Sequence, residues 1–213
     1  MSSLEIGLHS EKKSFISCEN GLVFISPQKI TGGIGSGKSF LCRLLEERGI
    51  QIYDCDDAAK RLMRHDKQLQ EKLIHLIGPD TYVKGELNKP VVAQFLLASE
   101  ANKQAINSIV HPAVIQDFYA SGMQWMECAI LFDANLQDSV DAVVCVSAPE
   151  AIRIERIMRR DNITNAKAKQ WIDAQISQER VEQMSDFVIQ NDGVTPMDKQ
   201  IDQLLSEWSK WVN

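Results

Sequence analysis

The stretch "ISPQKITGGIGSGKSF", Ile25 to Phe40, decides the fold because it contains "GGIGSGKS", Gly32 to Ser39, a full match to the pattern G-x-x-x-x-G-K-[ST]. Glycines at these positions let consecutive backbone N–H groups curl round a phosphate, and the helix that follows adds the positive end of its dipole. In such a loop Lys38 reaches the β- and γ-phosphates, and the hydroxyl of Ser39 holds Mg²⁺. The stretch therefore predicts a phosphate-binding loop that leads into a helix.

The bulk composition fits a globular protein with one well-buried core. The chain has 213 residues, of which 44% are hydrophobic and 24% charged, which is ordinary for a folded domain. Its net charge of −6 argues against nucleic acid or an anionic membrane as a partner, because such partners need a basic face. The five cysteines are scattered with no C-x-x-C pair, so we expect neither a disulfide framework nor a zinc site, and a cytoplasmic location.

Strand and helix patterns alternate along the chain. Apolar runs predict strands at Ile50–Tyr53, Met126–Phe132 and Ala142–Ala148, and a last strand with its turn at Phe187–Gly193. From Asp56 to about Met123 the pattern is helical, with Asn88 as an N-cap and Pro112 breaking the series. The alternation with one long helical insert predicts an α/β fold with a doubly wound, five-stranded parallel sheet.

Acidic residues accompany two of the predicted strands. Asp54 directly follows one of them, at the end of the sheet where ligands bind, and its carboxylate can accept a proton from an attacking hydroxyl or orient Mg²⁺ through water. Helix capping is the alternative, and the local sequence favours Asp56 over Asp54 for that role. Asp133 ends the next strand and can serve a metal through water, and Glu127 is either functional or part of a polar strand edge.

Arginines gather in the helical segment "PEAIRIERIMRRD", at positions 153, 156, 159 and 160. A solvated helix face is the usual reading of such a run. Arg156 and Arg160, however, lie four residues apart on one face and can clamp triphosphate oxygens during transfer. We favour the clamp, because an acidic protein with a phosphate loop needs mobile cations near that loop.

These motifs together resemble those of the dephospho-coenzyme A kinases, from Thr31 to Gly193. Besides the phosphate loop, the matching segments are "D-x-D" at Asp54 and Asp56, "L-x-K" at Leu87 to Lys89, "IVHP" at Ile109 to Pro112, "ILFD" at Ile130 to Asp133, "RIMRRD" at Arg156 to Asp161, "IDAQ" at Ile172 to Gln175 and "SDFVIQNDG" at Ser185 to Gly193. The resemblance implies transfer of the ATP γ-phosphate to the ribose 3′-hydroxyl of dephospho-coenzyme A. Mg²⁺ is the implied cofactor, and we expect a monomer or weak homo-oligomer.

The resemblance also implies a role for each candidate residue. The catalytic residues are Asp54 as the base, Lys38 and Arg160. The ATP-binding residues are Gly33, Gly35, Ser36, Gly37, Lys38, Ser39, Phe40, Arg156 and Asn191. Asp56 and His111 bind the acceptor, although a lone histidine at a helix junction is more often structural, and Ser39 serves the metal. The implied architecture is a P-loop nucleotide kinase core at 1–55 and 124–213, a helical acceptor-binding insert at 56–123 and a small helical lid at 160–176.

Three features depart from the family pattern. Trp171 stands where the family commonly has a lid arginine. The proline that usually precedes the "LLFE" motif is absent at Ala129, and Asp133 replaces its glutamate. The family's first strand ends in "IGL" and runs straight into "TGG", whereas here "LEIGL", Leu4 to Leu8, is separated from Thr31 by residues 9–30.

We interpret residues 9–30 as an insertion between the first strand and the phosphate loop. We expect Leu4–Leu8 to keep the central strand, because Pro27 in the competing approach cannot donate a ladder hydrogen bond. Leu22–Ile25 is the alternative strand. In either arrangement the loop geometry is strained, so activity could be lost while the fold survives.

Other functions remain open at this point. One is phosphorylation of a different small molecule or nucleoside by the same fold, and another is a catalytically silent nucleotide-binding protein that the insertion has disabled. A GTP-dependent switch is disfavoured, because it needs a guanine-reading N-K-x-D motif and both "NKPV" and "NKQA" lack the aspartate.

Overall fold

The structure is a computed structural model that describes residues 6–9, 13–18, 21–25, 27–128 and 140–212, and the side chains of residues 27–128 and 140–209. The chain divides into two compact units, the first formed by residues 1–53 and 123–213 and the second by residues 54–122. Within the described ranges, no helix combines the length and the apolar character needed to cross a membrane.

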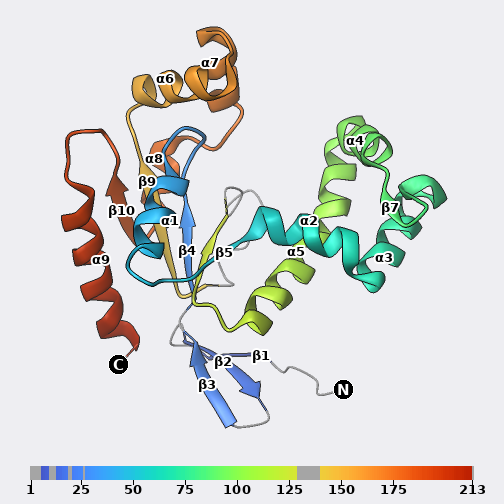
Figure 1. The fold of residues 1–213 in the computed structure, drawn as a ribbon, viewed down its shortest axis with the longest axis horizontal. Helices are drawn as coiled ribbons and strands as arrows, with labels where there is room; N and C mark the ends of the chain where they lie inside the picture. The colour runs from blue at the N-terminus through green and yellow to red at the C-terminus, as the bar shows by residue number, and fades with distance from the viewer. Residues whose placement is uncertain (1–5, 10–12, 19–20, 26, 129–139, 213) are drawn as a thin grey trace. The chain divides into compact units, whose positions relative to one another are not determined.

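The first unit is built on a five-stranded sheet with the order β10-β9-β4-β8-β5 (Figure 1). Its strands are β4 Gln28–Thr31, β5 Ile52–Asp54, β8 Trp125–Glu127, β9 Ala142–Ser147 and β10 Phe187–Gln190. β4 occupies the centre and pairs in parallel with β8 on one side and β9 on the other. The predicted doubly wound parallel sheet of five strands is therefore confirmed.

The expectation for the central strand is wrong. Gln28–Thr31 fills the central position, and Pro27 lies just before this strand, where its carbonyl accepts a hydrogen bond from Asp141 N at 2.9 Å. All four residues of β4 are buried, including Gln28 and Lys29. Because these two residues are polar, the sequence pattern did not indicate a core strand here. The last three residues of the predicted insertion thus belong to the strand that feeds the phosphate loop.

The N-terminal segment forms a separate antiparallel sheet of three strands, β1 Ile6–His9, β2 Lys13–Cys18 and β3 Gly21–Ile25. Leu8 of β1 pairs with Ser14, and Ile25 of β3 pairs with the same residue from the other side. In their described residues, Ile6–Leu8 and Leu22–Ile25, neither of the two segments expected as candidates for the central strand joins the parallel sheet.

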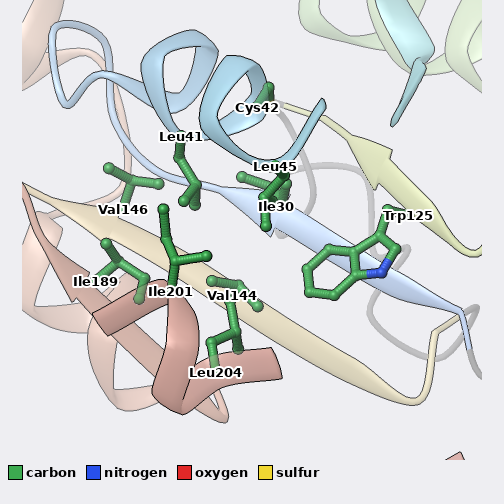
Figure 2. Close-up of a cluster of buried hydrophobic side chains, with 10 residues drawn as sticks. All are labelled: Ile30, Leu41, Cys42, Leu45, Trp125, Val144, Val146, Ile189, Ile201 and Leu204. Carbon is green, nitrogen blue, oxygen red and sulfur yellow. The ribbon is translucent and has the colours of Figure 1, made fainter. Parts of the chain in front are cut away.

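Two helices of the first unit, α1 Lys38–Glu46 and α9 Met197–Val212, pack on the same face of the sheet. The cluster between them contains Ile30, Leu41, Cys42, Leu45, Trp125, Val144, Val146, Ile189, Ile201 and Leu204 (Figure 2). Trp208 adds to it through an edge-to-face contact with Trp125, at 5.5 Å between ring centroids. Burial of this apolar surface is the main contribution to the stability of the unit.

The other face of the sheet is covered by α8, Gln178–Gln183, which contacts β9. Side chains alternate between faces along a strand, so Cys145 points away from the cluster that takes Val144 and Val146. Accordingly, Gln178 Nε2 on α8 donates a hydrogen bond to Cys145 Sγ at 3.5 Å. Two further helices, α6 Glu150–Asp161 and α7 Asn165–Asp173, connect β9 to α8.

The second unit is mainly helical. It contains α2 Cys55–His65, α3 Lys67–Ile77, the 3₁₀ turn η1 Pro79–Thr81, the short hairpin of β6 Tyr82–Val83 and β7 Glu86–Leu87, α4 Lys89–Ala98 and α5 Glu100–Ser121. The other three helices all contact α5. Its core includes Leu62, Leu69, Leu73, Val92, Ile106, Val110, Val114 and Phe118.

Pro112 does not break the helical series, which corrects the sequence-based expectation. α5 runs through it without interruption. A proline inside a helix costs about 3 kcal/mol because it removes one backbone hydrogen bond. The carbonyl that Pro112 leaves without its helical donor is that of Ser108, an exposed residue that water can reach, while Val110 and Val114 are buried and hold the helix in place.

The predicted strand at Met126–Phe132 begins one residue earlier, and β8 ends at Glu127. Residues 129–139 lie outside the described part of the chain, and with them the proposed metal role of Asp133 and the whole "ILFD" segment.

Candidate active site

The phosphate loop follows β4 directly and leads into α1, as the motif predicts. Gly35 and Gly37 have φ angles of +79° and +96°, a left-handed conformation that favours glycine. A Cβ atom on Gly37 would lie 2.1 Å from Asn191 Nδ2, so a side chain there would push the Asn191 amide away from Ser36 O. The loop thus has the conformation for which its glycines are needed.

The N-terminus of α1 is left open, unlike those of several other helices. Side-chain oxygens of Asp66, Ser99 and Thr164 accept hydrogen bonds from first-turn amides of α3, α5 and α7. α1 has neither a side-chain cap nor an acidic residue in its first turn. Because uncapped amides and the helix dipole attract anions, this helix terminus is suited to a phosphate.

Two side chains from distant parts of the first unit hold the loop in shape. Asn191 Nδ2 donates to Ser36 O at 2.7 Å, and Arg156 Nη1 donates to the same oxygen at 3.1 Å. Arg156 Nη2 also donates to Asn191 O at 3.0 Å, which joins the two supporting residues. The structure therefore brings together three predicted ATP-binding residues, with Arg156 bound to loop carbonyls in addition to its predicted role toward the triphosphate.

The side chains expected to meet the phosphates lie at the start of α1. Lys38 Nζ donates to Gly32 O at 2.7 Å, across the loop. Ser39 and Phe40 are exposed, and the guanidinium carbon of Arg43 lies 5.6 Å from the centroid of the Phe40 ring. Ser36 is fully buried, and no partner for its hydroxyl is found among the described residues.

Arg160 lies at the end of α6 and is largely exposed. Its Nη2 forms an ion pair with Asp161 Oδ2 at 2.7 Å, and this carboxylate raises the pKa of Arg160. Exposed ion pairs of this kind contribute only about 0–1 kcal/mol. The guanidinium can therefore exchange this partner for a phosphate at little cost.

Three predicted site residues belong to the second unit. Asp56 is exposed in the first turn of α2, and His111 is half-buried within α5. Asp54 is the last residue of β5, at the carboxyl end of that strand, and the N-cap of α2.

The structure assigns helix capping to Asp54, where the sequence favoured Asp56. Asp54 Oδ1 accepts a hydrogen bond from Asp57 N at 2.9 Å, because the extended backbone at Asp54 turns its carboxylate toward the first-turn amides. Asp54 is exposed, and this bond uses one oxygen and leaves Oδ2 outside it. Capping is therefore compatible with a chemical role for the same carboxylate.

A cavity of about 500 Å³ lies where the carboxyl end of β9 meets α6, α7 and α8. Its lining includes four carboxylates, from Glu150, Asp173, Glu179 and Glu182, and one arginine, Arg153. This excess of negative charge disfavours a triphosphate inside the cavity. The open loop and helix terminus form the better phosphate site.

The sequence did not identify two residues that contact the loop. Arg153 Nε donates to Ile34 O at 2.9 Å, and Ile34 N donates to Gln175 Oε1 at 2.8 Å. Arg153 is only 4% exposed, and burial lowers its pKa. The only signals in the sequence are that Arg153 begins the arginine run and that Gln175 ends the "IDAQ" segment, and neither signal indicates contact with the loop.

The sequence comparisons with known proteins point to one family. The sequence profile described as dephospho-CoA kinase matches residues 29–196, so the match begins inside β4. A dephospho-CoA kinase from Bacteroides fragilis is 38% identical over 188 residues, which cover 83% of this chain and 90% of that protein. One from Salinibacter ruber is 33% identical over 174 residues, 77% of this chain and 87% of that protein.

Solved structures support the fold. A crystal structure of a protein from Thermus thermophilus matches with a TM-score of 0.71 at 24% identity, and the match covers 89% of this chain and 98% of that one. The structure of a dephospho-CoA kinase from Campylobacter jejuni has a TM-score of 0.57 at 20% identity, and the match covers 86% of this chain and 97% of that one. The family profile, which spans most of the sequence, and the relatives at 33–38% identity show that the chain belongs to the dephospho-CoA kinase family.

Proposed function

We propose that this chain transfers the γ-phosphate of ATP to the ribose 3′-hydroxyl of dephospho-coenzyme A, giving coenzyme A and ADP. The observation that carries the proposal is the ordered phosphate loop, held by Arg156 and Asn191, in a chain of the dephospho-CoA kinase family. In the transfer, the bond between the γ-phosphorus and the oxygen that bridges to the β-phosphate breaks. The 3′-oxygen forms the new bond to phosphorus and gives up its proton.

On the nucleotide side, the amides at the start of α1 and the ammonium group of Lys38 bind the triphosphate. Lys38 Nζ, which donates to Gly32 O, is already within the loop and can exchange that carbonyl for phosphate oxygens. The exposed hydroxyl of Ser39 suits Mg²⁺, a hard cation that prefers oxygen ligands and is shared with substrate phosphates. When bound with ATP, Mg²⁺ neutralises negative charge on the phosphates.

On the acceptor side, Asp54 is the base that takes the proton of the 3′-hydroxyl. β5 ends at Asp54, and the carboxyl ends of the strands form the edge of the sheet where ligands bind in this class of fold. The hydrogen bond from Asp57 N fixes the carboxylate through Oδ1, so Oδ2 can accept the proton. We assign Asp56 and His111 to acceptor binding and Arg160 to charge stabilisation on the transferred phosphoryl group.

The silent-protein alternative loses its physical basis in this structure. It depended on an insertion between the first strand and the loop, but β4 ends at Thr31 and the loop begins at Gly32. The N-terminal strands β1 to β3 form their own sheet. The geometry therefore supports an active loop, in a protein that we expect to be cytoplasmic and a monomer or weak homo-oligomer.

The experiment is a phosphotransfer assay with a panel of acceptors: dephospho-coenzyme A, adenosine, shikimate and gluconate. Products are identified by mass spectrometry in the presence of ATP and Mg²⁺, and ATP binding is measured separately by calorimetry. We expect phosphate on dephospho-coenzyme A alone. Phosphate on another acceptor would instead establish a different small-molecule kinase, and ATP binding without any product would revive the silent alternative.

A further inference from the structure

Ile34, in the middle of the phosphate loop, has both of its backbone polar groups held by side chains that follow β9. Its N–H donates to Gln175 Oε1 at 2.8 Å, and its carbonyl accepts from Arg153 Nε at 2.9 Å. Gln175 lies just beyond α7, and Arg153 lies in the first half of α6. The peptide groups on either side of Ile34 are therefore fixed in orientation by a segment more than 100 residues away in the sequence.

The side chain of Ile34 is held by the same segment. It packs against a cluster whose buried members are Ile157 of α6 and Ala168 and Ile172 of α7. The partly buried members besides Ile34 are Ile154, Met158, Ile163 and Trp171. A residue of the phosphate loop thus completes the small core between α6 and α7.

The guanidinium of Arg153 extends this contact to α8. Its Nη1 donates to Gln178 Oε1 at 3.3 Å, and Gln178 Nε2 lies 3.3 Å from Glu182 Oε1. A Cβ atom on Gly33 would lie 2.3 Å from Arg153 Nη2, so the absence of a side chain there lets the arginine lie against the loop. Two helices, α6 and α8, and the loop share one network of polar contacts, which Gln175 extends to the segment just beyond α7.

We propose that Gln175 is a positioning residue for ATP, which acts by fixing the Ile34 amide and so ties the phosphate loop to α6 and α7. The proposal rests on the proposed function, because it concerns how the same loop binds the triphosphate. A loop whose peptide groups are already oriented binds phosphate without a further ordering cost. Nucleotide binding at the loop and the placement of α7 are then one coupled event.

Trp171 makes this coupling measurable. It stands on α7 at a position where the related kinases commonly carry an arginine, and it packs against the cluster that Ile34 enters. Its indole therefore senses any shift of the loop against α7. The difference in fluorescence between the full-length chain and the variant Trp171→Phe isolates this signal from the other tryptophans.

The test compares four variants of the full-length chain. Gln175→Leu removes the acceptor at similar volume, Gln175→Asn shortens its reach, and Gln175→Glu keeps an oxygen that can accept from Ile34 N. Gln170→Leu is the matched control, because Gln170 is an exposed glutamine of α7, shortly before Gln175 in the sequence, and its side chain accepts a hydrogen bond from Lys167 Nζ. Each variant is assayed for the dissociation constant of ATP by Trp171 fluorescence, for both KM values and for kcat.

We expect Gln175→Leu to raise the dissociation constant and the KM of ATP about ten-fold, or about 1.4 kcal/mol, as suits one lost hydrogen bond to a backbone amide. The KM of the acceptor should change less than two-fold, Gln175→Glu should stay within about three-fold of the parent, and Gln170→Leu should match it. If Gln175→Leu does not fold, Gln175→Asn carries the same expectation.

The inference would be overturned by unchanged ATP affinity in Gln175→Leu and Gln175→Asn, by equal changes in both KM values, or by a Gln175→Glu variant as weak as Gln175→Leu. Failure of the proposed function looks different. In that case the parent chain binds ATP and forms no coenzyme A, while the comparison of ATP affinities still decides the role of Gln175.

Discussion

The identity of the central strand gives a sharp stability prediction. Ile30 of β4 is fully buried in the cluster shared by α1, α9 and the sheet. Ile30→Ala removes three carbon groups, each contributing about 0.8 kcal/mol, so the loss of burial alone is about 2.4 kcal/mol. The cavity left in a well-packed core adds to this, and the total is about 3–4 kcal/mol. In a chain of this size such a loss lowers Tm by roughly 10 °C.

Urea and thermal unfolding, followed by tryptophan fluorescence, measure the effect, because Trp125 lies in the same cluster as Ile30. Leu8→Ala is the control, since Leu8 belongs to β1 and pairs with β2 outside the parallel sheet. We expect the control to leave the unfolding of the parallel-sheet core nearly unchanged. A Leu8→Ala variant that is as unstable as Ile30→Ala, or an Ile30→Ala variant as stable as the parent chain, would refute the assignment of β4.

Three further outcomes are expected. Asp54→Asn should lower turnover by about 10²–10⁴-fold and leave ATP affinity within about two-fold, because asparagine caps a helix as well as aspartate does but cannot take a proton. Kinetics at saturating ATP measure the turnover, and calorimetry measures the affinity. A variant with the turnover of the parent chain would remove Asp54 from the mechanism. Arg156→Lys should weaken ATP binding about ten-fold, since lysine cannot bridge Ser36 O and Asn191 O as the guanidinium does. Calorimetry measures the ATP affinity. An unchanged affinity would contradict the role of Arg156 in holding the phosphate loop. Burial raises the pKa of the Cys145 thiol to about 11 from 9.0, so the contribution of this thiol to stability is complete below pH 9 and declines as the pH rises toward 11. Over that range the free energy of unfolding should fall less steeply in Cys145→Ala than in the parent chain. Equal slopes would contradict the raised pKa of Cys145.

The parts of the structure that depend on local sequence could be predicted. The loop is one example, because the positive φ angles at Gly35 and Gly37 and the open helix terminus follow from a short run of residues. The alternation of strands and helices, and hence the class of fold, is another. In each case the information lies within about a dozen neighbouring residues.

Features that depend on distant contacts could not be predicted in this way. Gln28 and Lys29 are polar residues at the start of the central strand, and only pairing with β8 and β9 explains their burial. Pro112 was expected to break a helix that burial of Val110 and Val114 keeps intact.

The support of the loop is equally non-local. Asn191 reaches Ser36 across 155 positions, and Gln175 reaches Ile34 across 141. Motif matches did identify Asn191, but its action through the loop carbonyl appears only in the folded chain. Contacts of this kind are set by the order of strands in the sheet and by the path of α6 to α8, which no local pattern encodes.

This chain, with its N-terminal strands in place, is expected to phosphorylate dephospho-coenzyme A. The most direct measurement is the mass spectrum of dephospho-coenzyme A after incubation with the purified full-length chain, ATP and Mg²⁺. We expect a product heavier by one phosphoryl group that matches coenzyme A and is nearly absent with Asp54→Asn. Unchanged dephospho-coenzyme A in the presence of folded protein that binds ATP would contradict the claim.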